Sequence, residues 1–387
     1  MKLSSRCTLL EPSPTLAINA LAKERAAQGL PVFNLSTGEP DIITPEHIRR
    51  AAVAAIEAGA TRYTPVGGVK ELKAAIAKKM LRDVGVSYTP SHITCANGGK
   101  QILYNLFQVI LNEGDEVLCF SPYWVSYSTQ VALAGGVLKE VHLNAKNNFA
   151  FEPDVLARAI TKKTVAILIN SPSNPTGQVL SEEALRQIAD VARAHNVLVI
   201  TDDVYEYFYY TEKKPSHILC VAPDLISQTI IVNAVSKTYA MTGWRLGYAV
   251  GPENIIQKME ELQSHSASNP SSVSQMAAIE ALNGPQESVE EMRKSFLSRR
   301  NALLKLTEGM HVIVPQGAFY MMIDIHNKKK PGETDLALCL ALLKETGVAV
   351  IPGESFGVAA TGFVRISFAN TWEVIHGGIR ALMQFRA

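Results

Sequence analysis

The sequence predicts an α/β protein, with a large domain built on a mostly parallel sheet flanked by helices and a smaller α+β domain. From about residue 91, short apolar runs alternate with helical patterns, which is typical of a parallel sheet covered on both faces. The last third of the chain has a different, α+β pattern, and 387 residues exceed one ordinary domain. We therefore expect a large domain over residues 46–284 and a small domain formed by residues 1–45 and 285–387.

The chain before the alternating region is predicted to contain three helices and one short strand. The helical patterns cover residues 15–28, 45–58 and 69–83, and the strand covers residues 31–35. Pro45 suits the first position of its helix, where no N–H is needed. The loop after the strand contains Gly38, which either lets the backbone approach a ligand or simply serves a turn.

The alternating region supplies the strands of the expected large sheet. Strands are predicted over residues 93–96, 117–120, 137–143, 165–170, 197–201 and 229–235, and helices over residues 101–111, 123–133, 153–160 and 181–195. A long helical pattern follows from residue 253 to residue 283, interrupted at Asn269-Pro270. Ligands of such sheets bind beyond the carboxyl ends of the strands, so the residues just after each run are candidates for the site.

The C-terminal region is expected to complete the small domain. A helix over residues 286–307 precedes apolar segments at residues 312–314, 318–325, 336–346, 348–351 and 362–368. Residues 328–332 read as a solvated loop because three lysines precede Pro331 and Gly332.

The composition favours a small-molecule ligand. The formal net charge is +1 with 19% charged residues, which gives no electrostatic reason to expect nucleic acid or a membrane as partner. The five cysteines are far apart and form no CxxC pair, so neither a metal site nor a disulfide framework is expected. No apolar stretch approaches membrane-spanning length, and the N-terminal residues do not resemble a signal peptide. We expect a cytoplasmic protein.

Lys237 follows the apolar run 229–235 and is the central candidate. Burial disfavours an ammonium group and lowers its pKa, and a neutral amine can form a Schiff base with an aldehyde. Arg245 offers a planar cation suited to phosphate, and Gly243 and Gly247 allow close backbone approach. A phosphorylated aldehyde beside a lysine indicates pyridoxal phosphate. A hairpin with a surface lysine and a structural arginine explains this stretch alone equally well.

A glycine turn follows the first strand of the large sheet and opens a helix. Gly98, Gly99 and Lys100 lie there, and the unpaired amides of a helix N-terminus attract an anion such as phosphate. Many strand–helix turns contain two glycines for geometry alone, so the turn is a weak signal by itself.

Polar and aromatic residues follow three further strands. Trp124 is placed either to stack on a flat ligand or simply to pack, and a proline-rich loop presents Asn174. Asp202 would need a partner if buried; a protonated pyridine nitrogen would serve, and a helix N-cap is the competing explanation. Tyr205 could bond the ring hydroxyl of the cofactor, so several strand ends together supply what pyridoxal phosphate needs.

The sequence resembles the class I aminotransferases of the fold type I pyridoxal-phosphate family, closest to the bacterial aspartate aminotransferase subgroup. The resemblance runs from about Pro12 to the C-terminus. It is carried by Gly38-Glu39-Pro40-Asp41, Tyr63, Gly98-Gly99-Lys100-Gln101, Pro122-Tyr123-Trp124, Asn174-Pro175-Thr176-Gly177, Asp202-x-x-Tyr205, Ser236-Lys237 with Arg245, and Phe363-Val364-Arg365-Ile366-Ser367.

The resemblance implies catalytic roles for Lys237, Asp202 and Tyr205, and a homodimer in which Tyr63 reaches the partner's active site. It implies cofactor binding by Gly98, Gly99, Lys100, Trp124, Asn174, Asp202, Tyr205, Ser236, Lys237, Arg245 and Tyr63. It implies amino acid and 2-oxo acid binding by Gly38, Lys100, Trp124, Asn174 and Arg365. Two residues depart from the family pattern, because Ala234 replaces a hydroxyl residue and Asp203 a glutamate.

The resemblance favours aspartate and 2-oxoglutarate as substrates, because Lys100 could meet a distal carboxylate. A solvent-facing lysine is the alternative, and from the residues alone Arg365 could equally belong to a structural salt bridge. Aromatic amino acids, alanine and prephenate stay open as substrates, as does a carbon–sulfur β-lyase on the same fold. A regulatory domain without turnover and a Schiff-base lyase on a barrel fit the pattern less well.

Overall fold

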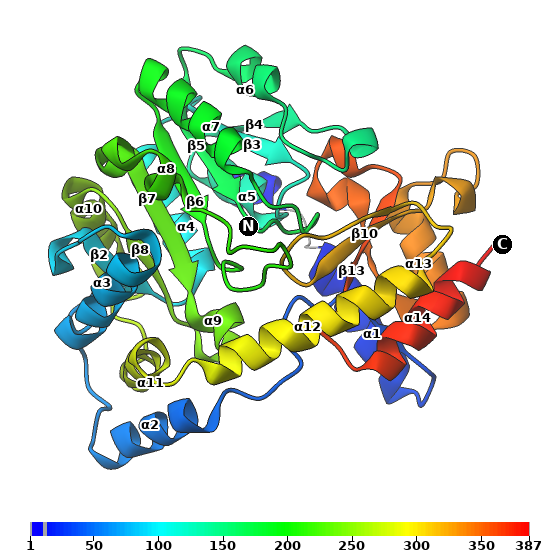
Figure 1. Cartoon of the computed structure of the whole chain (residues 1–387), viewed down its shortest axis with the longest axis horizontal. Helices are drawn as coiled ribbons and strands as arrows, with labels where there is room; N and C mark the ends of the chain where they lie inside the picture. The colour runs from blue at the N-terminus through cyan, green and yellow to red at the C-terminus, as the bar shows by residue number, and fades with distance from the viewer. Residues whose placement is uncertain (1, 11–13, 387) are drawn as a thin grey trace.

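The larger part of the molecule is built around a seven-stranded sheet (Figure 1). The structure is a computed structural model that describes residues 2–10 and 14–386. The strand order is β2-β8-β7-β6-β5-β3-β4. The pairs from β7 to β4 are parallel, whereas β8 is antiparallel to both neighbours. The strands are β2 (Ile93–Ala96), β3 (Glu116–Ser121), β4 (Val137–His142), β5 (Thr164–Asn170), β6 (Leu198–Asp202), β7 (Thr229–Ala234) and β8 (Gly247–Val250). The expected mostly parallel sheet is confirmed.

Helices cover both faces of this sheet. One face packs against α3 (Lys70–Val84), α6 (Pro153–Ala159), α7 (Glu182–His195), α8 (Ile218–Val221) and α11 (Ser272–Asn283), with α2 (Glu46–Glu57) beyond α11. The other face packs against α4 (Gly99–Ile110), α5 (Ser126–Leu133) and α10 (Glu253–Ser264). In β5, Ile167 and Ile169 enter the first core and Ala166 and Leu168 the second, as the two-residue period of a strand requires.

The second part of the molecule contains two small sheets. The four-stranded sheet β12-β13-β10-β9 is antiparallel, and β1 pairs with β11 in parallel. The strands are β1 (Phe33–Asn34), β9 (Val312–Ile313), β10 (Tyr320–Asp324), β11 (Val348–Ala349), β12 (Ile351–Pro352) and β13 (Phe363–Ser367). The segment 348–351, expected as one element, is thus divided between two sheets, because its first half pairs with β1 and its second half with β13.

The helices of this part are α1 (Pro14–Ala27), α12 (Glu287–Leu306), α13 (Asp335–Thr346) and α14 (Trp372–Gln384). Figure 1 shows α12 running along the molecule from the large sheet to α14. Helix α14 was not predicted, although Ile375, Ile379 and Leu382 recur at helical spacing and are fully buried. None of the helices in the described residues is long and apolar enough to cross a membrane.

A buried ion cluster joins α3 to the segment after β6. The Lys79 ammonium lies 2.9 Å from Asp83 and 2.6 Å from Glu206, and its side chain is only 2% exposed. Burial would lower the pKa of Lys79, but the carboxylates of Glu206 and Asp83 outweigh it and the pKa is raised. Glu206 also accepts from Asn233 of β7 at 2.7 Å. The cluster therefore fixes the backbone next to Tyr205.

Replacing Lys79 by methionine is expected to lower the free energy of unfolding by about 3–5 kcal/mol, because it leaves the little-exposed Glu206 carboxylate without a cationic partner and Asp83 with Arg82 alone. Urea unfolding of the cofactor-saturated protein measures this. Lys78→Met, at the exposed neighbouring position, is the matched control and should shift stability by about 0.5 kcal/mol or less. Equal effects of the two variants would contradict the role of the cluster.

Candidate active site

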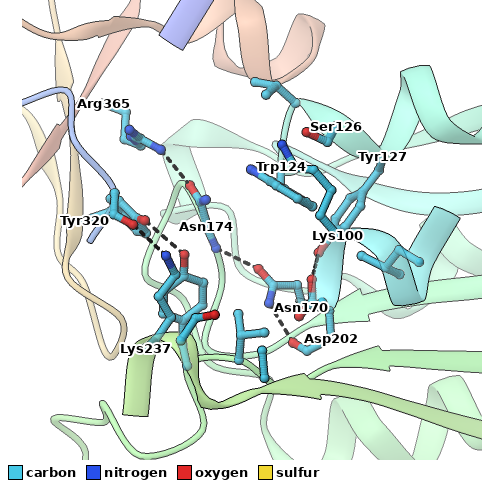
Figure 2. Close-up of a pocket in the computed structure, with 18 of the residues that line it drawn as sticks. Lys100, Trp124, Ser126, Tyr127, Asn170, Asn174, Asp202, Lys237, Tyr320 and Arg365 are labelled. Carbon is cyan, nitrogen blue, oxygen red and sulfur yellow. Dashed lines mark hydrogen bonds between the residues drawn. The ribbon is translucent and has the colours of Figure 1, made fainter. Parts of the chain in front are cut away.

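A cavity of about 320 Å³ opens at the carboxyl ends of the large-sheet strands (Figure 2). Asn170 ends β5, Asp202 ends β6, and Lys237 follows β7 in the short helix α9 (Val235–Thr238). Arg365 of β13 faces them from the small sheet. The cavity is thus formed between the two sheets, at the position where parallel sheets bind ligands.

The structure brings together most of the residues expected from the sequence. The cavity is lined by Gly38, Gly99, Lys100, Trp124, Asn174, Asp202, Tyr205, Ser236, Lys237, Arg245 and Arg365. Gly98 lies directly before this lining, against the Arg245 guanidinium. Tyr63 does not reach the cavity of its own chain, and its side chain is 90% exposed.

Lys237 is held with its amine in the cavity. Its Nζ donates to the Gly38 carbonyl oxygen at 2.7 Å. Burial, with a smaller contribution from Arg245 and Arg365, lowers the pKa of Lys237 to about 8, against the opposing influence of Glu39. Part of the population therefore carries a neutral, nucleophilic amine near neutral pH.

Asp202 is buried at the floor of the cavity, 5% exposed. Tyr127 donates to its Oδ2 at 2.5 Å, and the Asn170 amide donates to its backbone oxygen at 2.7 Å. Burial raises the pKa of Asp202 to about 6, and the Tyr127 hydrogen bond partly offsets this. Its Oδ1 has no hydrogen-bond partner among the described residues, so this carboxylate is left with an acceptor for a cationic donor.

Arg245 and the glycine turn form the anion-binding end of the cavity. Gly98 has φ +88°, and a Cβ there would lie 2.6 Å from Arg245 Nη2, so only glycine fits. Arg245 donates to the carbonyl oxygens of Thr242 and Asn97. Helix α4 begins at Gly99 and directs its free amides to the same end.

Lys100 lies with its Nζ 5.0 Å from the centre of the Trp124 ring. Burial, and then the nearby Arg245, lower the pKa of Lys100. No described carboxylate forms an ion pair with it. The cavity is therefore lined by a further cationic side chain that has no acidic partner among the described residues.

Arg365 is 3% exposed and lies on the side of the cavity opposite Asp202. It donates to the Ser36 carbonyl oxygen at 2.6 Å and to Asn174 Oδ1 at 3.2 Å, and its guanidinium lies 4.4 Å from the centre of the Tyr320 ring. Its Nε has no partner, and none of the described carboxylates lies within ion-pair distance. The structural salt bridge considered above is therefore not found in this part of the chain.

Three residues of the site were missed from the sequence: Tyr127, Asn170 and Tyr320. Asn170 is the last residue of its strand, so the rule about strand ends could have identified it. Tyr127 lies inside α5, and Tyr320 hydrogen-bonds Tyr205 at 2.9 Å from a distant part of the chain. Neither had a local signal. Helix α5 begins at Ser126 rather than near residue 123, which leaves Trp124 in the loop.

These features together define a pyridoxal-phosphate enzyme. The residues fit the cofactor on two grounds: Asp202 keeps one buried oxygen without a partner among the described residues, and the lysine with a lowered pKa lines the same cavity as that carboxylate and an anion-binding turn. Asp202 would hold the pyridine nitrogen, Lys237 the aldehyde carbon, and Arg245 with Ser236 the phosphate.

The chain belongs to the aminotransferase class I and II family, whose model matches residues 31–381. It is a pyridoxal-phosphate-dependent aminotransferase. An aspartate aminotransferase of Bacillus sp. (strain YM-2) is 47% identical over 99% of this chain and 98% of the relative. An aspartate/prephenate aminotransferase of Cereibacter sphaeroides is 42% identical over 100% of this chain and 98% of the relative. The solved structure of an aspartate aminotransferase from Thermus thermophilus with maleate has a TM-score of 0.94 at 39% identity, with full coverage of both chains.

The lowered pKa of Lys237 predicts its reactivity in the cofactor-free protein. Labelling by trace acetic anhydride, read by mass spectrometry, should rise with pH and reach half of its maximum near pH 8, because only the neutral amine reacts. A lysine in an unstructured peptide, with a pKa of about 10.4, is the internal standard. A profile for Lys237 that follows the peptide would contradict the effect of burial.

Proposed function

We propose that this enzyme transfers the amino group of aspartate to 2-oxoglutarate by a ping-pong mechanism. The observation that carries the proposal is the buried Arg365, which has no carboxylate partner among the described residues and faces the lysine amine across the cavity. A planar guanidinium binds a carboxylate in a bidentate manner. Arg365 would thus take the α-carboxylate common to both substrates, helped by Asn174 and the backbone of Gly38.

Lys237 would act as the base of the reaction. When bound, pyridoxal phosphate supplies an electron sink for the substrate α-carbon. Lys237 Nζ would accept the proton from that carbon, and Asp202 would keep the pyridine nitrogen protonated. Tyr205 and Asn174 would hydrogen-bond the ring oxygen, and Trp124 would pack against the ring.

The anion-binding end would hold the cofactor phosphate. Arg245, Ser236, and the Gly99 and Lys100 amides are the donors available there. Ala234 lines the cavity without a hydroxyl, so phosphate binding rests on these groups. Asp203 does not line the cavity, and it accepts a hydrogen bond from Thr201 at 3.0 Å.

The preference for a dicarboxylic substrate rests on Lys100. Its ammonium is a second cation for a distal carboxylate, and it has no acidic partner in the described residues. The names of the relatives, aspartate aminotransferase and aspartate/prephenate aminotransferase, and the maleate in the related structure support a dicarboxylate. Prephenate, a larger dicarboxylic oxo acid, is therefore the second candidate.

We also propose a cytoplasmic homodimer with an active site shared between the two subunits. Ile43, Val53, Ile56 and Tyr63 are more than half exposed in the single chain, and such apolar side chains gathered over residues 43–63 favour an interface. Tyr63 would reach the partner's phosphate site from there. Residues 46–284 would form the large domain, and residues 1–45 and 285–387 the small one.

Stopped-flow mixing of the cofactor-loaded enzyme with single amino acids tests the function. Aspartate and glutamate should convert the cofactor spectrum to that of pyridoxamine phosphate, and 2-oxoglutarate should reverse the change. Lys237→Ala should remove turnover and leave a folded protein. Multiple turnovers by this variant would overturn the assignment, whereas pyruvate release from cystathionine without an amino acceptor would indicate a β-lyase.

Replacing Lys100 by alanine should raise KM for aspartate and 2-oxoglutarate by about tenfold or more and leave KM for alanine within about twofold, because a hydrogen bond to a charged group contributes about 1.5–3 kcal/mol. Steady-state kinetics with both amino donors measure the difference. An equal loss for aspartate and alanine would assign Lys100 to the cofactor rather than to the distal carboxylate.

A further inference from the structure

A short turn of the small sheet contacts Arg365. The 3₁₀ turn Gly353–Phe356 follows β12, and its Phe356 ring is fully buried. The ring centre lies 5.2 Å from the Arg365 guanidinium carbon. The position of this turn therefore helps to set where the guanidinium lies.

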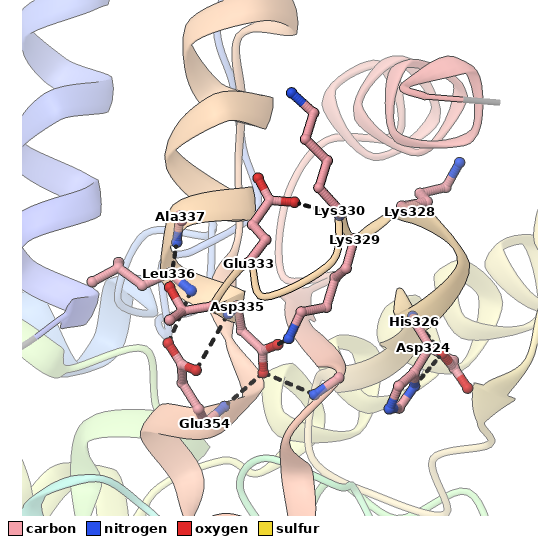
Figure 3. A network of polar contacts seen from close by, with 12 residues as sticks. Asp324, His326, Lys328, Lys329, Lys330, Glu333, Asp335, Leu336, Ala337 and Glu354 are labelled. Atoms are coloured by element: carbon pink, nitrogen blue, oxygen red, sulfur yellow. Dashed lines mark hydrogen bonds and ion pairs between the residues drawn. The ribbon is translucent and has the colours of Figure 1, made fainter.

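Two carboxylates hold the turn against α13 in a reciprocal arrangement (Figure 3). Glu354 of the turn accepts from the backbone nitrogens of Asp335 and Leu336, at 3.2 and 2.9 Å. In return, the Asp335 carboxylate accepts from the backbone nitrogen of Glu354 at 3.2 Å. The Glu354 side chain of the turn thus accepts from free amides at the start of α13. The Asp335 side chain of α13 accepts from a backbone amide of the turn.

Asp335 has a further backbone partner at the strand that carries Arg365. Its Oδ2 accepts from the Gly362 nitrogen at 2.9 Å, one residue before β13. The Asp335 side chain is completely buried, and the Lys329 ammonium lies 2.5 Å from its other oxygen. One carboxylate therefore connects the start of α13, the turn with Phe356, and the start of the Arg365 strand.

The turn is also tied to the large sheet. The backbone nitrogen of Tyr123, in the loop after β3, donates to the Phe356 carbonyl oxygen at 2.9 Å. Trp124 is the next residue along the chain. This hydrogen bond holds the carbonyl end of the turn beside the loop, whereas the Asp335 contacts hold its start against α13 and β13.

We propose that Asp335 is a positioning residue that fixes Arg365 for the substrate α-carboxylate, through the turn with Phe356 and through Gly362. The proposal rests on the proposed function, in which Arg365 binds that carboxylate. Asp335 does not line the cavity. Its replacement would leave the cofactor contacts intact and misplace the guanidinium.

The test is Asp335→Asn in the cofactor-loaded enzyme. The amide nitrogen of the introduced asparagine would face either the backbone N–H groups of Glu354 and Gly362 or the Lys329 ammonium. The donors on that side would therefore lose their acceptor. KM for aspartate and for 2-oxoglutarate should both rise about tenfold with kcat within about threefold, as expected for lost uniform binding of the substrate. The dissociation constant of the non-reacting dicarboxylate maleate, measured by calorimetry, should rise by a similar factor.

Glu333→Gln is the matched control. Glu333 precedes α13, and it binds Arg386 and the Lys330 backbone rather than the turn or β13. Its replacement should leave both KM values and the maleate dissociation constant within about twofold. Equal changes in the two variants would indicate a general loss of small-domain structure and would overturn the proposal.

A double variant separates positioning from other effects. In an Arg365→Ala background, adding Asp335→Asn should change kcat/KM by less than about twofold, because the group that Asp335 positions is gone. An additive tenfold loss would overturn the proposal. If Asp335→Asn does not fold, Phe356→Leu keeps the turn and removes the ring from Arg365; it should raise both KM values, and unchanged values would overturn the proposal.

Failure of the proposed function is distinguishable from failure of this inference. If the unmodified enzyme does not transaminate aspartate, the function is wrong. If it does, and Asp335→Asn binds maleate and both substrates as tightly as the unmodified enzyme, only the positioning role is wrong.

Discussion

The site depends on keeping one lysine amine uncharged inside a cavity that also holds the cations of Arg245 and Arg365. Burial acts most strongly on Lys237, and Arg245 and Arg365 add to its effect by repulsion. Neither guanidinium has a carboxylate partner in the described residues that would cancel its charge. The same two arginines thus have two effects. Their positive charges favour the neutral form of the Lys237 amine, and their N–H groups can bind the anionic groups of cofactor and substrate.

The two sheets supply opposite halves of this environment. The large sheet brings Asp202 and Lys237 to its carboxyl edge, and the small sheet brings Arg365 to the same cavity. The aromatic contact between Tyr205 and Tyr320, joined by a hydrogen bond of 2.9 Å, lies where the halves meet. The electrostatics of the site are therefore a property of how the two parts of the chain pack, not of either sheet alone.

The sequence was most informative where a functional side chain lies at or just after the end of a strand. Lys237, Asp202 and Asn174 could be found in this way because parallel strands deliver their last residues to one edge. Arg365 became a site residue only through the family resemblance, since an arginine in an apolar strand fits a salt bridge equally well. Tyr127 and Tyr320 escaped prediction because their places depend on helix rotation and on the meeting of distant segments. The mostly parallel sheet followed from periodicity, whereas the division of residues 348–351 between two sheets depended on long-range pairing.

The pairing of β1 with β11 also constrains the order in which the chain folds during its synthesis. Phe33 lies beside Val348, and one hydrophobic core contains Ile18 and Leu35 together with Ile375 and Leu382 of the last helix. The N-terminal segment therefore cannot pack against its partners until almost all of these residues have been synthesised. Its apolar side chains stay exposed to solvent until then. The large sheet has its residues available much earlier, and domains generally fold as units during synthesis. Nascent chains should thus acquire the lysine-bearing half of the catalytic cavity before the half that carries Arg365.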